Sequence, residues 1–251
     1  MPDLFILTSP QVTGEHKIFL EQLGLEWNRP ESLTPAELIV EFAGRLCYMS
    51  FGDKQSPRTN AEYVRNLINQ GHESVLEHAS WTFLLTGVSR AFSHQLVRHR
   101  IGFSYSQLSQ QYHDETEATF IQPAGLESSA LALQAWRSAT AQASSTYKTL
   151  LKTFEATEAS SKEKMRMIRS AARSILPAAT ETSIVVTANA RSLRHFLSLR
   201  GGIVGDTEMR LVSHLLLAAL SVEAPSLFAD FNSHIADDGL PIILGPRLQS
   251  T

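Results

Sequence analysis

The sequence HQLVRHRIGFSYSQLSQQY, residues 94–112, is the stretch on which the fold and the predicted site depend. It places two guanidinium groups and two imidazoles within residues 94–100 and follows them with Ser, Gln and Tyr. Arginines at the end of a helix bind phosphate or carboxylate in fork geometry, and hydroxyls and amides hydrogen-bond to the polar edges of a ring. The alternative is a solvated basic helix end, because cations late in a helix favour its dipole.

The composition is that of an ordinary globular protein. The chain has 251 residues, 43% of them hydrophobic and 19% charged, with a net charge of -3. No apolar run approaches the roughly 20 residues of a bilayer span, the N-terminus lacks signal-peptide features, and the one cysteine, Cys47, cannot form an internal disulfide. We expect a cytoplasmic protein without nucleic-acid or membrane partners, and an RNA-binding module would need a basic face that this composition lacks.

The periodicity of apolar residues predicts an α+β fold. Strands and helices mix without strict alternation, so we expect a mixed sheet with long helices in a single domain, residues 1–251. The strands are expected at residues 4–8, 79–87 (closed by Gly87) and 182–188. Helices are expected to open at Thr34, Thr59 and Ser89, which are read as caps, from about Ser161, and at Asp206. Two more are expected over 128–151 and 191–200, the helix from Ser89 is expected to run to about His99, and a loose tail is expected after Pro225.

Helical spacing also predicts which side chains pack inward. In the helix after Thr34 the inner face is expected to hold Ile39, Val40, Phe42, Ala43 and Leu46, with Cys47 continuing the packing. Leu193, Phe196, Leu197 and Leu199 are expected inside the helix at 191–200. The repeat of Arg166 and Arg169 is interpreted as a solvated basic face.

Three polar clusters are predicted at the ends of these elements: residues 95–111, Arg173, and residues 189–200. Arginines gathered in this way, Arg194 among them, suit phosphorylated ligands in a chain of negative net charge. No Gly-x-Gly-x-x-Gly turn after a strand, Walker loop or nucleophile elbow occurs, so side chains would have to hold a nucleotide cofactor. His72 and His78 are six apart, which separates them by roughly 120° on a helix, so no metal site is predicted.

The segment from Arg98 to Ser109 resembles the signature of the flavin-dependent thymidylate synthase family, which reads Arg-His-Arg, seven residues, then Ser. Four further blocks are similar to family blocks in the same order, at residues 41–48, 71–80, 172–177 and 189–196. The resemblance covers about residues 38–222. It implies a homotetramer with active sites between subunits that methylates dUMP to dTMP, with FAD as cofactor and NADPH and methylenetetrahydrofolate as co-substrates.

The resemblance also implies roles for individual residues. FAD would be contacted by Ser74, Arg98, His99, Arg100, Gln107, Asn189, Ala190, Arg191 and His195. The substrate dUMP would be contacted by Gln95, Arg98, Gln107, Leu108, Ser109, Gln110, Gln111, Arg173 and Arg200. Arg200 would be the catalytic residue, placed beside the pyrimidine to favour ionisation at N3. Hydride comes from the flavin, so no protein nucleophile is needed, and His72, Glu73, Glu77 and His78 are interpreted as structural.

The chain departs from the family pattern at the signature. Eight residues separate Arg100 from Ser109, with Ile101 or Gly102 as the extra one, and Gln111 stands where the family usually carries Arg. A lost charge-assisted hydrogen bond to phosphate is worth roughly 1.5–3 kcal/mol. A second hypothesis therefore stays open, that of an FAD- or nucleotide-binding paralogue with weakened or lost dUMP turnover.

Overall fold

The computed structural model describes residues 1–29, 32–158 and 161–246, which form two compact units. The first unit comprises Met1–Asp3, Leu85–Arg98 and Tyr105–Val185. The second comprises Leu4–Leu84, His99–Ser104 and the chain from Val186 onward. Helices and strands occur in both, which confirms the α+β class, and the single domain stays a prediction.

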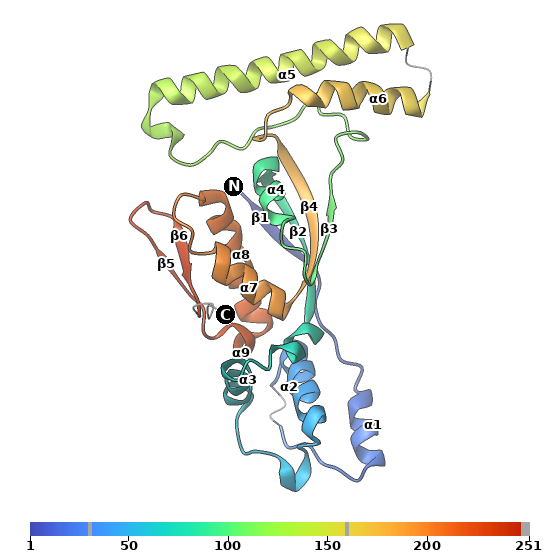
Figure 1. Ribbon diagram of the computed structural model, residues 1–251, viewed down its shortest axis with the longest axis vertical. Coiled ribbons are helices and arrows are strands. Elements are labelled where there is room, and N and C mark those ends of the chain that lie inside the picture. Colours follow the sequence, from blue (N-terminus) through green and yellow to red (C-terminus); the bar gives the residue numbers. More distant parts are fainter. Residues whose placement is uncertain (30–31, 159–160, 247–251) are drawn as a thin grey trace. The chain divides into compact units, whose positions relative to one another are not determined.

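Four strands form one sheet in the order β1-β2-β4-β3 (Figure 1). They are β1 Asp3–Thr8, β2 Ser80–Ser89, β3 Phe103–Gln107 and β4 Glu181–Asn189. Every second residue of β4 from Thr182 to Ala188 is buried, as alternation along a strand requires when one face is covered. Three of these strands lie where the sequence predicts them, whereas β3 occupies residues for which no strand was expected.

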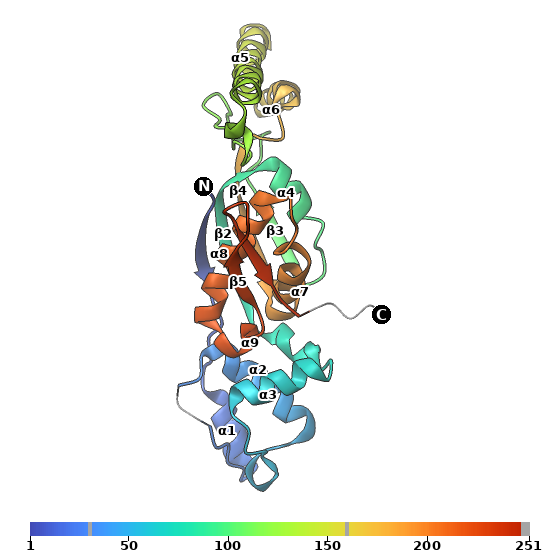
Figure 2. The same ribbon diagram turned by 90° about the vertical axis from the view of Figure 1, so that its left-hand side faces the viewer.

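The first unit holds a helical hairpin next to the signature segment. Its helices are α4 Arg90–Leu96, α5 Ala130–Glu158 and α6 Lys162–Ala172, with short 3-10 turns η3 Leu126–Ser128 and η4 Arg173–Ile175. The helices α5 and α6 run side by side (Figures 1 and 2) and enclose Tyr147, Leu151, Ile168 and Ala172. Ser89 caps α4 as predicted, and Ser161, near which a helix was expected to start, caps α6.

The second unit contains the remaining helices and a hairpin. Its elements are α1 Glu15–Gln22, α2 Pro35–Tyr48, η1 Gly52–Lys54, α3 Asn60–Asn69, η2 Glu73–His78, α7 Ala190–Arg200, α8 Thr207–Glu223, α9 Pro225–Phe228, β5 Asn232–Ile235 and β6 Pro241–Leu244. Thr34 and Thr59 form complete capping boxes, with Glu37 and Glu62 at the third helical position, and Asp206 caps α8.

The inner face of α2 differs from the prediction. The helix buries Glu37, Val40, Glu41 and Arg45, whereas Leu46 is exposed and Cys47 is exposed rather than packed. The reason is an internal ion pair, because Arg45 Nε lies 2.6 Å from Glu41 Oε1 and its guanidinium stacks over Tyr63 at 4.6 Å. Paired charges can therefore be buried on a helix face that hydropathy does not mark as the inner one.

Three more expectations about local structure were wrong. Gly87 does not close its strand, because β2 continues to Ser89 with Gly87 at φ 63°. Leu199 is 38% exposed, since it lies on the outer side of α7. The chain after Pro225 is not a loose tail, because it forms α9 and the antiparallel β5–β6 hairpin, and buried Arg210 donates to both carboxylate oxygens of Asp238 and to the carbonyl of Pro241.

Candidate functional site

In the second unit, His99 of the signature segment forms a pair with Arg200, the last residue of the predicted polar cluster at residues 189–200. Helix α4 ends at Leu96 rather than near His99, so His99 lies in the turn before β3. Arg200, the last residue of α7, donates from its Nε to His99 Nε2 over 3.1 Å. Burial, together with the charges of the nearby Arg200 and His195, lowers the pKa of His99 to about 4. His99 is therefore a neutral acceptor at physiological pH.

The extra residue of the signature is accommodated by a tight turn. Gly102 has φ 71°, and Ile101 beside it is 90% exposed. Ser192 Oγ donates to the Ile101 carbonyl over 2.9 Å, while Asn189 caps α7 by accepting from the Ser192 backbone N–H. A Cβ at Gly102 would lie 2.1 Å from Ser192 Oγ and 2.7 Å from Asn189 Nδ2. The inserted turn and the N-terminus of α7 are thus packed directly on each other.

Replacing Gly102 with alanine is expected to lower the free energy of unfolding by about 2–4 kcal/mol, from left-handed backbone strain and overpacking. The matched control is Gly205→Ala, because Gly205 also has positive φ but nothing lies within 4 Å of its Cβ position. That control should cost only about 1–2 kcal/mol. Urea unfolding measures both changes, and equal losses at the two positions would contradict the packing argument.

Arg191 is held on the surface by two carboxylates of η2. Its Nη1 lies 2.6 Å from Glu77 Oε1 and its Nε 3.5 Å from Glu73 Oε2. Glu73 and Glu77 therefore have the structural role expected of them, and exposed Ser74 lies between them in the sequence. Arg194 does not join this cluster, contrary to the prediction, because it is buried and binds Asp230 through both terminal nitrogens at 2.6 Å.

The side chain of Gln107 is hydrogen-bonded to other residues of the first unit. Its Nε2 donates to Ser93 Oγ over 2.8 Å and to Thr182 Oγ1 over 3.3 Å. The neighbouring Leu108 N–H donates to the Ser183 carbonyl. Gln107 thus anchors the segment that leads into the Ser109–Tyr112 turn.

The Ser109–Tyr112 turn is held by α6. Gln111 Nε2 donates to Ser170 Oγ over 2.9 Å, and its Oε1 accepts from Arg166 Nε over 3.3 Å. Arg166 also stacks over the Tyr112 ring at 5.5 Å, and Arg169 Nη1 donates to the Tyr112 carbonyl over 2.5 Å. Arg166 is exposed, as a solvated basic face predicts, whereas Arg169 is half-buried, and the prediction missed that both arginines contact the turn that carries Gln111.

A second arginine group lies next to this turn. Burial lowers the pKa of Arg90, with Glu115 and Arg173 as its charged neighbours, and burial raises the pKa of Glu115. Arg90 Nη1 donates to the Leu108 carbonyl over 3.4 Å. Gln110 is 6% exposed, and its Nε2 is buried without a hydrogen-bond partner. The first unit thus brings Arg90, Arg173 and the polar turn into one neighbourhood.

The predicted site residues divide between the units. The first unit carries Gln95, Arg98, Gln107, Leu108, Ser109, Gln110, Gln111 and Arg173. The second carries Ser74, His99, Arg100, Asn189, Ala190, Arg191, His195 and Arg200. Gln95 and Arg98 are exposed and do not share a helix face, because Arg98 follows the end of α4. Sequence reasoning missed Arg90, and it set Arg166 and Arg169 aside although their spacing was visible.

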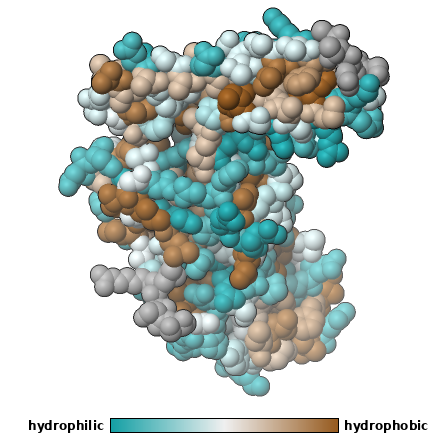
Figure 3. All heavy atoms as spheres, turned by 45° about the horizontal axis from the view of Figure 1, so that its top comes forward, coloured by the Kyte–Doolittle hydropathy of each residue, from teal (hydrophilic) through white to brown (hydrophobic). Residues whose placement is uncertain are grey.

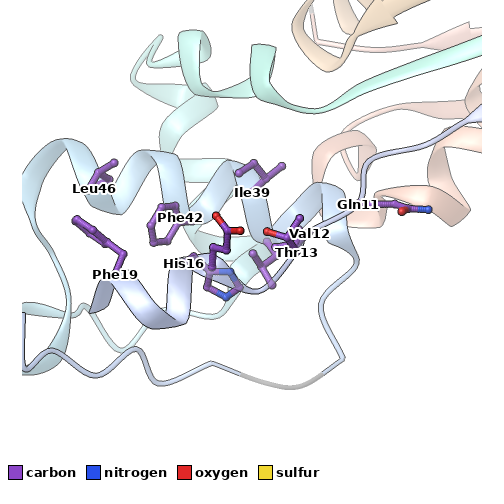
Figure 4. A pocket seen from close by; sticks show the side chains of 10 residues that line it. Gln11, Val12, Thr13, His16, Phe19, Ile39, Phe42 and Leu46 are labelled. Carbon is purple, nitrogen blue, oxygen red and sulfur yellow. The ribbon is translucent and has the colours of Figure 1, made fainter. Parts of the chain in front are cut away.

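Other features of the described residues lie apart from these clusters. A pocket of about 440 Å³ in the second unit is lined mainly by apolar side chains of α1 and α2, Phe19, Ile39, Phe42 and Leu46 among them (Figure 4). None of the predicted site residues lines it. No group of three or more His, Cys, Asp or Glu side chains in the described residues could hold a metal ion. None of the helices among them is long and apolar enough to cross a membrane.

An α+β protein whose helix ends carry arginines beside amides and hydroxyls is of a class that binds phosphorylated ligands. Comparison with known proteins defines it further. Residues 31–226 match the family model Thy1, described as thymidylate synthase complementing protein, and the chain belongs to this family.

Three similar relatives have the name flavin-dependent thymidylate synthase. The one from Mycolicibacterium gilvum is 44% identical over 83% of this chain and 84% of its own length. Those from Mycobacteroides abscessus and Mycobacterium tuberculosis are 41% and 42% identical, each over 91% of this chain and 92% of the relative. The resemblance first seen at residues 98–109 thus extends over most of the chain.

Proposed function

We infer that this protein catalyses the reductive methylation of dUMP to dTMP, with FAD as cofactor, methylenetetrahydrofolate as carbon donor and NADPH as reductant. One observation carries the inference, which is that the family match over residues 31–226 spans every predicted site residue. The alternative of a paralogue without turnover gains no support from relatives that all have the synthase name.

The second unit carries most of the residues proposed to bind FAD. Asn189, Ala190 and Arg191 lie at the N-terminus of α7, where backbone N–H groups and the helix dipole favour an anion. The side chain of Arg191 is 49% exposed and directed by its two carboxylates, and Ser74, Arg100 and His195 are also exposed. These donors fit the diphosphate and polar ring edges of FAD, which supplies hydride when bound.

The first unit supplies the residues proposed to bind the dUMP phosphate. Arg98 and Arg173 offer guanidiniums, and the Ser109–Tyr112 turn offers the Ser109 hydroxyl and the amide side chains of Gln110 and Gln111. Gln95 and Leu108 flank them. We propose that Arg200 lies beside the pyrimidine and stabilises negative charge at N3, because a guanidinium donates hydrogen bonds and stays protonated at all working pH values.

The most direct test uses purified protein and tritium-labelled dUMP. Flavin absorbance bands should be present or appear when FAD is added, and tritium release should require both NADPH and methylenetetrahydrofolate. Bound FAD without dUMP-dependent turnover would instead establish the paralogue.

Arg166 is proposed to supply the positive charge that Gln111 lacks. Gln111 accepts from Arg166 Nε, and in the described part of the chain the terminal nitrogens of Arg166 have no hydrogen-bond partner. We expect Arg166→Ala to weaken dUMP binding about tenfold or more, the loss of one charge-assisted hydrogen bond. Isothermal titration with dUMP measures this, and Arg137→Ala on exposed α5 is the control. Equal affinities of the two variants would contradict the role.

We also propose the homotetramer with active sites between subunits. Figure 3 shows separate hydrophobic areas along the helical hairpin of the first unit. On this hairpin Leu131 is 78% and Met167 61% exposed. Exposed apolar area of this kind marks surfaces that another protein chain covers. Analytical ultracentrifugation tests the assembly. A biosynthetic role in nucleotide supply supports the cytoplasm as the proposed location.

A further inference from the structure

We propose that His99 is a positioning residue for Arg200: its imidazole accepts the Nε–H of Arg200 and so fixes the plane in which the guanidinium meets the substrate. The proposal rests on the proposed function, in which Arg200 contacts the pyrimidine. It adds a role that FAD contact alone would not give His99. The observation that carries it is the 3.1 Å hydrogen bond between Arg200 Nε and His99 Nε2.

The bond constrains Arg200 because a guanidinium is planar. Nε carries one N–H at one edge of the plane, and the two terminal nitrogens carry the other four. An acceptor at Nε therefore fixes the tilt of the plane and leaves the terminal nitrogens for a ligand. In the described part of the chain, these terminal nitrogens of Arg200 have no protein partner.

The acceptor is itself held in place by aromatic rings. The His99 ring meets Phe196 edge-on, with centroids 5.0 Å apart and an interplanar angle of 76°, and lies 6.0 Å from Phe103. Phe196 is completely buried, and it precedes Arg200 by four residues on α7. One helix face therefore presents both the ring that orients His99 and the guanidinium that His99 orients.

The protonation state of His99 fits an acceptor. To accept at Nε2 the neutral ring must carry its proton on Nδ1, whereas a protonated imidazole donates from both nitrogens. Arg200 and His195 are among the charged and titratable groups beside the ring, and burial together with these neighbours lowers its pKa to about 4. The bond is therefore present at neutral pH and lost as the pH falls through about 4.

The test is a double-mutant cycle on the FAD-loaded enzyme. The variants are His99→Leu, His99→Gln, Arg200→Ala and His99→Leu combined with Arg200→Ala. His99→Leu removes the acceptor and should lower kcat about tenfold to a hundredfold when the enzyme is saturated with FAD. His99→Gln offers an oxygen in place of Nε2 and should retain kcat within about threefold, less than the loss of one neutral hydrogen bond. His234→Leu, at an exposed histidine of β5, is the matched control and should leave kcat unchanged.

The outcomes separate the two proposals. If His99 acts through Arg200, the double variant should be no slower than Arg200→Ala alone. If the kcat losses of the two single variants multiply in the double variant, the positioning role is overturned and the proposed function stays intact. The same holds if the defect of His99→Leu is confined to FAD binding. If Arg200→Ala keeps full kcat, the assignment of Arg200 and the positioning role both fail.

The pH profile gives an independent readout. The ratio of wild-type kcat to the kcat of His99→Gln should be constant from neutral pH to about pH 5. Below about pH 5 this ratio should decrease, because the imidazole, with its pKa of about 4, becomes protonated there and the glutamine side chain does not. A ratio that instead changes near the ordinary histidine pKa of about 6.5 would show that His99 is not held as a neutral acceptor. Damage to the fold in His99→Leu would not affect this ratio, because the ratio compares the wild type with the conservative variant His99→Gln.

Discussion

Replacing Arg200 with alanine is expected to lower the kcat of dTMP formation by about 10²–10³, the usual cost of removing one donor that stabilises developing negative charge. The expectation follows from the position of Arg200 at the end of α7, oriented by His99. The KM for dUMP should change less, because the interaction strengthens as charge develops on the ring. Steady-state tritium release measures both constants.

Two comparisons make the Arg200 test specific. Arg200→Lys keeps the charge without the planar fork, so it should recover only part of the lost rate. Arg137→Ala, at an exposed position of α5, should have wild-type kcat. Loss of flavin absorbance in Arg200→Ala would point to a cofactor defect, and unchanged kcat with full flavin content would refute the catalytic assignment.

Replacing Arg45 with methionine is expected to lower the free energy of unfolding by about 3–5 kcal/mol, because it leaves a buried carboxylate without its cation. Arg45 is 0% and Glu41 3% exposed, and the remaining partner of Glu41 is Asn60, whose Nδ2 donates over 2.7 Å. A urea titration of the purified protein measures the change.

A double variant distinguishes the effect of the Glu41–Arg45 ion pair on stability from the effect of leaving one buried charge unpaired. Glu41→Leu combined with Arg45→Met removes both charges and should regain at least half of the lost stability, as apolar replacements of buried pairs do. Lys148→Met, which breaks an exposed ion pair with Glu117, should cost no more than about 1 kcal/mol. A single-variant loss as small as that of Lys148→Met would mean that water reaches Glu41.

Local sequence signals were reliable for the starts of helices. The caps Thr34, Thr59, Ser89, Ser161 and Asp206 all open helices as predicted. This is because a capping side chain bonds to backbone within three residues of itself, so both partners are visible in one window of sequence.

Pairs between distant segments were not predictable in the same way. Arg194 and Arg191 lie three residues apart on one helix, yet Arg194 pairs with Asp230 in the interior and Arg191 with Glu77 at the surface. Arg166 and Arg169 were interpreted as solvated because their partners, Gln111 and Tyr112, lie more than 50 residues away. In α2 the predicted stripe was right at Val40 but wrong at Leu46 and Cys47, and the burial of Arg45 was missed because it depends on Tyr63 of another helix.

The amino-acid sequence by itself determined the helix starts, three of the four strands of the main sheet, and the resemblance on which the predicted chemistry rests, because these depend on short spacings of residue types. Only the tertiary structure decided which arginines are available to a ligand and which are used in packing. An arginine that binds a ligand and one that is used in packing carry the same guanidinium group. Which role it has depends on the carboxylates, rings and carbonyls that folding brings to it from other parts of the chain.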